Sequence, residues 1–270
     1  MARLETAIFD LGVLDVLARQ NSPIHRLDPR TKLITTIIFA GAVISFDKYE
    51  ISGLTFFFVY PAILMTMANI PLGLLFKKLL VVAPFAFFIG IANPFLDRAV
   101  LLYVGPIAVS GGWISFASIM LRFVLTVSVA LILIATTGVM GVCMALERLK
   151  VPQIMCVQLL LLYRYLFVLI DEATLLVRAR ALRSFSRRGM GITITGHMIG
   201  YLLLRTLNRA RRIYLAMLCR GFDGKIRLLR QMRMGLLDGI YILGWATSFI
   251  VMRLYDLPQL AGRWITGLFT

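Results

Sequence analysis

The residues best suited to chemistry in this chain are arginines. Between Arg178 and Arg233 the sequence holds thirteen arginines and one lysine against one acid, Asp223, and so supplies thirteen of the sixteen net positive charges. A guanidinium is a planar fork that donates hydrogen bonds to carboxylates, phosphates or backbone carbonyls in fixed geometry. The stretch therefore indicates recognition of acidic or polar groups, with anionic lipid or an acidic protein as the leading partners beside a membrane.

One pattern occurs twice within this stretch, 37 residues apart. An alanine is followed four residues later by an arginine, then by a small residue and a phenylalanine, as Ala179, Arg183, Ser184, Phe185 and again as Ala216, Arg220, Gly221, Phe222. Residues four apart share a helix face, so each alanine leaves a low surface beside its arginine. A small residue after a helical run is a stop signal, which predicts that each arginine lies at an exposed helix end. We interpret both motifs as protein-docking points; ordinary positive-inside arginines or a lipid-headgroup patch are the alternatives.

Other ionisable residues offer little catalytic chemistry. Arg122 is the main ionisable residue inside an apolar segment, and it could anchor packing, snorkel, pair within the bundle or contact a partner protein. The two histidines, His25 and His197, and three scattered cysteines form no converging ligand set, so we expect no metal site. The sequence contains neither a GxxxxGK(S/T) run for ATP nor a recognisable nucleophile arrangement, and it predicts no cofactor and no enzymatic activity.

The elements that must position these residues are membrane helices. The chain of 270 residues is 60% apolar with a mean hydropathy of +0.86, which predicts an all-α, polytopic integral membrane protein. About five spans are expected, together with a cytosolic helical coupling platform. The expected spans are Leu33 to Phe46, Ile51 to Asn69, Val81 to Phe95, Ile114 to Gly138 and Met234 to Met252. An interfacial segment at residues 70–78 and a loop from Leu96 to Gly112 are expected between them, and Asn93-Pro94 should break the third span.

The segment from Gln153 to Ile170 is ambiguous because it is apolar enough to span but holds Arg164. Assigning it as a buried, non-spanning helix keeps most lysines and arginines on one side of the membrane. The resulting division has a cytosolic segment at 1–32, spans 1–4 at 33–138, a mainly cytosolic coupling region at 139–233, and the last span with its tail at 234–270. The amino terminus is then cytosolic and the carboxyl terminus lies outside.

The chain resembles the transmembrane T component of energy-coupling factor transporters, most closely the cobalt-type subunit. The paired motifs are similar to that family's two Ala-Arg-Gly signatures, although the first reads Leu182-Arg183-Ser184 and the second Cys219-Arg220-Gly221. Similar elements between about residues 25 and 224 are the run His25 to Leu33, Asn93-Pro94, Tyr163-Arg164-Tyr165 and Asp171-Glu172-Ala173.

This resemblance implies a function and a set of partners. The partners would be a pair of ABC-type ATPases and a separate substrate-binding membrane subunit that holds the metal, in a bacterial or archaeal cytoplasmic membrane. Ala179, Arg183, Ser184, Ala216, Arg220 and Gly221 would couple to the ATPases, while Arg122, Arg164, Asp171 and Glu172 would support the bundle or contact partners. The chain would serve cobalt uptake, with a T component for nickel, biotin or another vitamin as one alternative. A polytopic membrane enzyme or assembly factor is another alternative. A membrane protein that binds lipid or nucleic acid through the arginines is a third, and its nucleic-acid form is disfavoured because few aromatic residues lie between the arginines.

Overall fold

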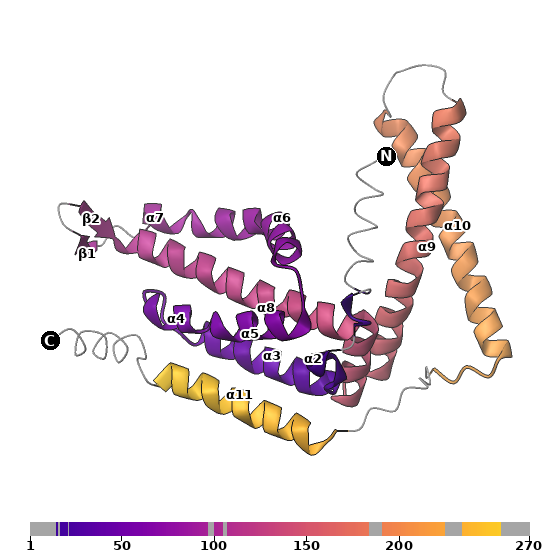
Figure 1. Cartoon of the computed structure of the whole chain (residues 1–270). Coiled ribbons are helices and arrows are strands. Elements are labelled where there is room, and N and C mark those ends of the chain that lie inside the picture. The colour runs from indigo at the N-terminus through magenta and orange to yellow at the C-terminus, as the bar shows by residue number, and fades with distance from the viewer. Residues whose placement is uncertain are drawn as a thin grey trace. The chain divides into compact units, whose positions relative to one another are not determined.

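The structure is a computed structural model that describes residues 15, 17–20, 22–96, 100–104, 107–183, 191–224 and 234–254. Its described residues are mainly helical and fall into two compact units (Figure 1). We call the unit formed by the described residues from 15 to 138 and from 234 to 254 the membrane bundle, and the unit formed by the described residues from 139 to 224 the arginine arm.

The membrane bundle contains most of the elements. They are α2 (Pro23–Arg26), α3 (Pro29–Ile44), α4 (Ser52–Phe56), α5 (Val59–Ala68), α6 (Leu72–Gly90), α7 (Asn93–Leu96), β1 (Val100–Val104), β2 (Ile107–Ser110), the first part of α8 (Gly111–Arg148), and α11 (Leu236–Leu254). The arginine arm contains the end of α8, α9 (Gln153–Arg183) and α10 (Ile192–Cys219).

Four helical stretches within the described residues are long and apolar enough to cross a membrane: Leu72–Phe95, Gly111–Arg148, Gln153–Arg183 and Leu236–Leu254. The other apolar helices are shorter, because α3 has 16 residues and α4 and α5 are separate helices between Ser52 and Ala68. Spanning a bilayer takes about 20 helical residues. The all-α, multi-pass membrane class is confirmed, while the expected number of five spans stays a prediction.

An aromatic cluster holds the membrane bundle together. Phe39 of α3, Phe57 and Tyr60 beside and within α5, and Phe249 of α11 are each 2% exposed or less. The ring centroid of Phe39 lies 5.0 Å from that of Tyr60 and 5.3 Å from that of Phe249. Because lipid tails are as apolar as these rings, close packing and ring geometry, rather than transfer out of water, must supply most of the stabilisation.

Helix α8 leaves helical geometry at Gly138, where φ is 71° and ψ is 157°. This is the residue at which the sequence predicts the fourth span to end, and glycine alone adopts this region without strain. The Thr136 carbonyl, two residues before the break, accepts a 3.0 Å hydrogen bond from Lys32 Nζ. A buried ammonium at a helix carboxyl end is also favoured by the helix dipole.

Two expectations between residues 70 and 112 need correction. Helix α6 runs without a break from Leu72 to Gly90 and includes Lys77 and Lys78, so no separate interfacial segment precedes the span. Lysine side chains are long enough to reach an interface from within a helix, which makes such a start possible. The predicted loop after Leu96 contains an antiparallel hairpin of β1 and β2. The predicted break near Asn93-Pro94 is confirmed, because α6 ends at Gly90 and α7 begins at Asn93.

Candidate functional site

The arginine arm consists mainly of two long helices that contact each other without forming a conventional core. Helix α9 has only Cys156 and Glu172 buried, and α10 has no buried residue. Large apolar side chains such as Leu203 and Leu215 of α10 are more than half exposed. Among residues 153–170 only Cys156 is buried within the described structure, and the other apolar side chains are half-buried or exposed, so the embedding expected for this segment stays a prediction. Isolated helices gain most of their stability from packing, so these helices need contacts from outside the arm.

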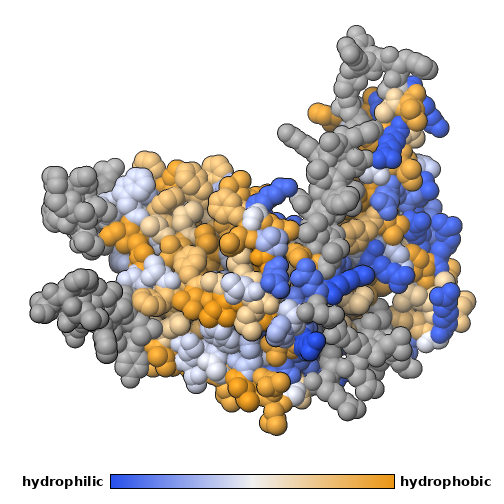
Figure 2. All heavy atoms as spheres, in the orientation of Figure 1, coloured by the Kyte–Doolittle hydropathy of each residue, from blue (hydrophilic) through white to orange (hydrophobic). Residues whose placement is uncertain are grey.

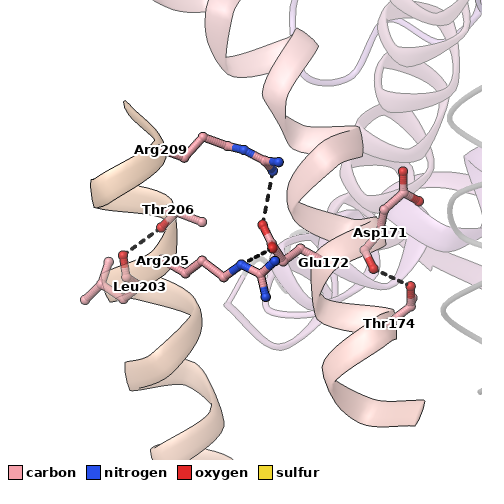
Figure 3. Close-up of polar contacts among 7 residues, drawn as sticks. All are labelled: Asp171, Glu172, Thr174, Leu203, Arg205, Thr206 and Arg209. Carbon is pink, nitrogen blue, oxygen red and sulfur yellow. Dashed lines mark hydrogen bonds and ion pairs between the residues drawn. The ribbon is translucent and has the colours of Figure 1, made fainter. Parts of the chain in front are cut away.

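A single carboxylate joins the two helices. Glu172 of α9 forms ion pairs with Arg205 and Arg209 of α10, and its Oε2 lies 3.1 Å from Arg209 Nη1 (Figure 3). The two arginines are four residues apart and therefore share a helix face. The Glu172 side chain is only 6% exposed, whereas those of Arg205 and Arg209 are 50% and 42% exposed. The carboxylate is thus enclosed by its two partners, and we call this arrangement the Glu172 clasp.

The neighbouring candidates from the sequence do not join the clasp. Asp171 points away from α10, and its backbone carbonyl accepts a 2.7 Å hydrogen bond from the Thr174 hydroxyl (Figure 3). Arg164 is exposed, with its guanidinium 5.9 Å from the ring centroid of Tyr165. Glu172 was singled out through the resemblance, and a spacing of four places Arg205 and Arg209 on one helix face, but nothing in the sequence indicates that α9 and α10 meet at these residues.

An apolar groove of about 360 Å³ lies between α9 and α10. Leu161, Tyr165 and Leu169 line it from α9, and Tyr214 and Met217 line it from α10. The remaining lining residues are Val157, Leu162, Val168, Glu172, Thr206, Arg209, Ala210, Ile213 and Phe222. Hydrophilic side chains gather on the face of these helices that Figure 2 shows. Of the helically spaced residues Leu207, Ala210, Tyr214 and Met217, the last three therefore face α9, while Leu207 does not line the groove and is 53% exposed.

The second motif forms a defined helix end. Arg220 is the C-cap of α10, and Gly221 adopts a left-handed conformation with φ of 77°. The Gly221 N–H donates to the Leu218 carbonyl at 2.9 Å, and the Phe222 N–H donates to the Met217 carbonyl at 3.0 Å. This pair of bonds is the Schellman motif, and it explains why glycine follows the arginine. The predicted exposed helix end at Arg220 is confirmed.

The first motif lies at the end of α9. Arg183 is the last residue of that helix and is exposed, while Ser184 and Phe185 lie outside the described residues. Ala179 and Ala216 are both exposed one turn before their arginines. Among the described residues, neither Arg183 nor Arg220 forms an ion pair or a side-chain hydrogen bond. Both motifs thus place a guanidinium next to a low, open helix surface, where it can donate to acceptors on another molecule.

Arg122 belongs to the membrane bundle and is anchored to backbone. Its Nη2 donates to the Phe46 carbonyl at 2.9 Å and to the Asp47 carbonyl at 2.6 Å, at the end of α3. Of the roles considered for Arg122 from the sequence, packing within the bundle therefore has direct support.

The histidines and cysteines do not gather with acids. Within the described ranges no group of three or more His, Cys, Asp or Glu side chains could hold a metal ion. His197 is exposed on α10. His25 Nε2 donates to the Leu17 carbonyl at 3.0 Å, which leaves Nδ1 to accept from the Ser22 hydroxyl at 2.7 Å. Burial, followed by the nearby Lys32 ammonium, lowers the pKa of His25.

Comparison with known protein families shows to which family the chain belongs. The cobalt transport protein family CbiQ matches residues 20–232, which include every described helix before α11. The chain belongs to the CbiQ family. It is therefore a multi-pass membrane protein of a transporter family related to the T components of energy-coupling factor transporters.

Individual relatives support the same assignment. An energy-coupling factor transporter transmembrane protein, EcfT, of Leuconostoc gelidum is 27% identical over 86% of this chain and 94% of its own length. An uncharacterised protein of Methanocaldococcus jannaschii is 29% identical over 86% of this chain and 82% of its own. The cobalt transport protein CbiQ of Rhodobacter capsulatus is 34% identical over a shorter region, 36% of this chain and 40% of its own. The family match at residues 20–232 covers both motifs in the arginine arm and most of the membrane bundle.

Proposed function

We propose that this CbiQ-family chain is the coupling subunit of an ATP-driven uptake transporter for cobalt ions. In this proposal two ATP-binding-cassette ATPases hold the arm at Arg183 and Arg220, and a separate membrane subunit binds the ion. ATP binding closes the ATPase pair and changes the crossing angle between α9 and α10. This change moves the substrate-binding subunit. The chain resides in a bacterial or archaeal cytoplasmic membrane with its amino terminus in the cytosol.

The observation that carries the proposal is the matched surroundings of the two motif arginines. Each guanidinium is exposed at a carboxyl-terminal helix end, and each has an exposed alanine four residues earlier. An ATPase acceptor can therefore approach the helix backbone beside Ala179 or Ala216 while the arginine reaches it. A charge-assisted contact buried on docking is worth on the order of 2 to 5 kcal/mol when one partner is removed, far more than an exposed pair.

The Glu172 clasp supports the proposed transmission step. It ties α9 to α10 by ion pairs, and from there toward Val157 of α9 and Phe222 beyond α10 the groove lies between the two helices. Two rods joined by a single polar contact can change their crossing angle without disrupting a large packed interface. Ala179, Ser184 and Gly221 complete the proposed coupling surface, Arg164 and Asp171 remain supporting contacts on the exposed face of α9, and no nucleic acid takes part.

The first test reverses the two motif charges together. Arg183→Glu with Arg220→Glu is expected to release the ATPases during purification of the complex in detergent, because carbonyl or carboxylate acceptors would then face a carboxylate. The amount of ATPase that copurifies with the membrane subunit is the readout. The matched control is Arg211→Glu, since Arg211 is also exposed on α10 but lies nine residues before Arg220, on the opposite face at about 100° per residue.

The second test fills the low surface beside Arg220. Ala216→Trp is expected to reduce uptake by keeping the ATPase away from the helix, whereas Leu215→Trp replaces an already bulky, 59% exposed neighbour and is expected to have little effect. Stoichiometric ATPase and normal uptake in both the double arginine variant and Ala216→Trp would reject the docking role.

The substrate assignment rests on the family and has one alternative with a specific observation behind it. The family is described as cobalt transport protein, while several relatives are named EcfT without a substrate. A T component for nickel, biotin or another vitamin is the second candidate. Purification of the intact complex from native membranes, followed by elemental analysis and mass spectrometry of bound small molecules, distinguishes them: cobalt supports the first and a bound vitamin supports the second.

A further inference from the structure

A polar hollow of about 510 Å³ lies within the membrane bundle, separate from both arginine motifs in sequence. Ser115, Ser118 and Arg122 line it from one face of α8, since they are spaced three and four residues apart. Asn93 of α7 and Lys48 from the turn after α3 line it from other elements. The Asn93 amide donates to Ser115 Oγ at 3.3 Å. The lining contains two cationic side chains and no carboxylate.

Two buried polar atoms beside this hollow have no hydrogen-bond partner. They are Arg122 Nε and Ser118 Oγ, and the whole of Ser118 is only 1% exposed. Arg122 Nη2 donates to the two carbonyls that follow α3, and the buried Nε has no acceptor among the described residues. Buried donors without partners are uncommon and costly, and so is a partly buried cation without a counter-charge.

A second arginine at the end of α3 makes the difference plain. Arg253 of α11 donates to the Ser45 carbonyl at 3.0 Å, much as Arg122 holds the next two carbonyls. Arg253, however, also pairs with the Glu50 carboxylate at 3.3 Å and lies over the Phe46 ring. Arg122 has no ion pair with any described residue. Both arginines donate hydrogen bonds to backbone carbonyls that follow α3. Among the described residues Arg253 has a carboxylate partner and Arg122 has none.

We propose that the hollow binds a phosphate group, supplied by a phospholipid headgroup or by the free ion. A phosphate provides the negative charge that Arg122 lacks and several acceptors for its Nε–H, the Ser118 hydroxyl and the Lys48 ammonium. A residue near the lining residues in sequence favours the lipid source. Trp113 is 60% exposed, and exposed tryptophan is typical of the headgroup level of a bilayer. Basic pockets between membrane helices are known sites for anionic headgroups.

The experiment uses the full chain, purified in detergent and stripped of native lipid. Three probes are added in turn: phosphatidylglycerol, inorganic phosphate, and diacylglycerol, which has the same chains without phosphate. Bound lipid is counted by native mass spectrometry, and the apparent Kd of each probe follows from the shift in thermal unfolding. Phosphatidylglycerol is expected to bind the native chain, and Arg122→Gln is expected to weaken it by about tenfold, since one charge-assisted contact is lost. Protection by inorganic phosphate alone would assign the site to the free ion.

Two further variants keep the test sharp. Arg253→Gln removes a cation that holds the same end of α3 but does not line the hollow, and it is expected to leave phosphate binding unchanged. Ser118→Asp places a carboxylate four residues before Arg122, where it can supply the missing counter-charge from within the chain. This variant is expected to fold and to lose phosphate binding, so the test does not depend on Arg122→Gln folding.

Three results would overturn the proposal. One is equal binding of phosphatidylglycerol by the native chain and Ser118→Asp, and another is equal binding of diacylglycerol and phosphatidylglycerol. The third is unchanged lipid and phosphate binding in Ser118→Asp together with loss of the substrate-binding subunit from the assembled complex, because that outcome would assign the Arg122 counter-charge to an acidic side chain of that partner.

Discussion

The membrane bundle and the arginine arm are built on opposite principles. In the bundle, rings from α3, α5 and α11 are buried against one another, with Phe39 and Phe57 fully enclosed. In the arm, α10 buries no residue and meets α9 chiefly through the Glu172 clasp. The bundle therefore supplies its own packing, whereas the arm leaves its apolar and basic surfaces for other molecules. One chain can thus combine a part that is packed by its own residues with a part whose helix packing depends on partner molecules.

The largest expected effect tests the packing half of this comparison. Phe39→Ala removes a ring that contacts Phe57, Tyr60 and Phe249, and it should lower the free energy of unfolding by about 2 to 3 kcal/mol, mainly through the cavity it leaves. Leu207→Ala in α10, at a position 53% exposed, should change it by less than about 0.5 kcal/mol. Denaturant unfolding in detergent measures both. Equal losses would mean that the arm has a core of its own.

The next effect tests the single joint of the arm. Glu172→Gln leaves Arg205 and Arg209 without a counter-charge and should weaken the contact of α9 with α10 by about 1 to 2 kcal/mol, a value reduced because both arginines are about half exposed. Distances between spin labels on the two helices should broaden. Asp171→Asn is the matched control, since it removes the adjacent carboxylate, which points away from α10. A broadening as large in that control would reject the clasp as the joint.

A smaller effect concerns the end of α10. Alanine at Gly221 must adopt a left-handed backbone with φ near the observed 77°, which costs about 1 kcal/mol and should fray the helix end that presents Arg220. Faster amide hydrogen exchange at residues 218–222 is the readout. Gly200 lies in the interior of the same helix with open space around it, and alanine favours the helical conformation more than glycine does. Gly200→Ala should therefore slow amide hydrogen exchange around residue 200. Unchanged amide hydrogen exchange in Gly221→Ala would mean that the Schellman motif is not needed to hold the helix end at Arg220.

The smallest effect is a pH dependence confined to the membrane bundle. Because the folded-state pKa of His25 is lowered by burial and by Lys32, the unfolded chain binds its proton more readily. The stabilisation is complete above the ordinary value of 6.5 and decreases as the pH falls below it. His25→Gln should flatten this part of the stability profile, while His197→Gln, at an exposed position on α10, should not. If His25→Gln lost as much stability as the native chain when the pH falls below 6.5, the pH dependence would be due to other groups.

The sequence predicted local features well. Hydropathy and charge were sufficient for the all-α membrane class, and the glycine stop signal was sufficient for the helix end at Gly221, whereas the non-helical backbone at Gly138 was not predicted. These features depend on neighbouring residues, which a sequence displays directly. The continuous start of α6 was missed because Lys77 and Lys78 resemble an interfacial boundary, although long side chains allow both to lie within a helix.

Contacts between distant residues could not be predicted in the same way. The Glu172 clasp joins residues 33 and 37 positions apart, and Lys32 reaches the Thr136 carbonyl across 104 positions. Helical periodicity states which residues share a face but not which face meets which. The carbonyl partners of Arg122 were equally hidden, because backbone acceptors carry no residue-type signal. The partner-docking roles of Ala179, Arg183, Ser184, Ala216, Arg220 and Gly221 stay predictions for the experiments above.

The absence of any buried residue in α10 has a consequence for the life of the chain in a cell. A subunit synthesised in excess of its companions would display this uncovered helix to membrane proteases and chaperones, which act on exposed apolar surface. We therefore expect the steady-state amount of the chain to follow the supply of the other subunits, so that balanced production is enforced by degradation of the surplus.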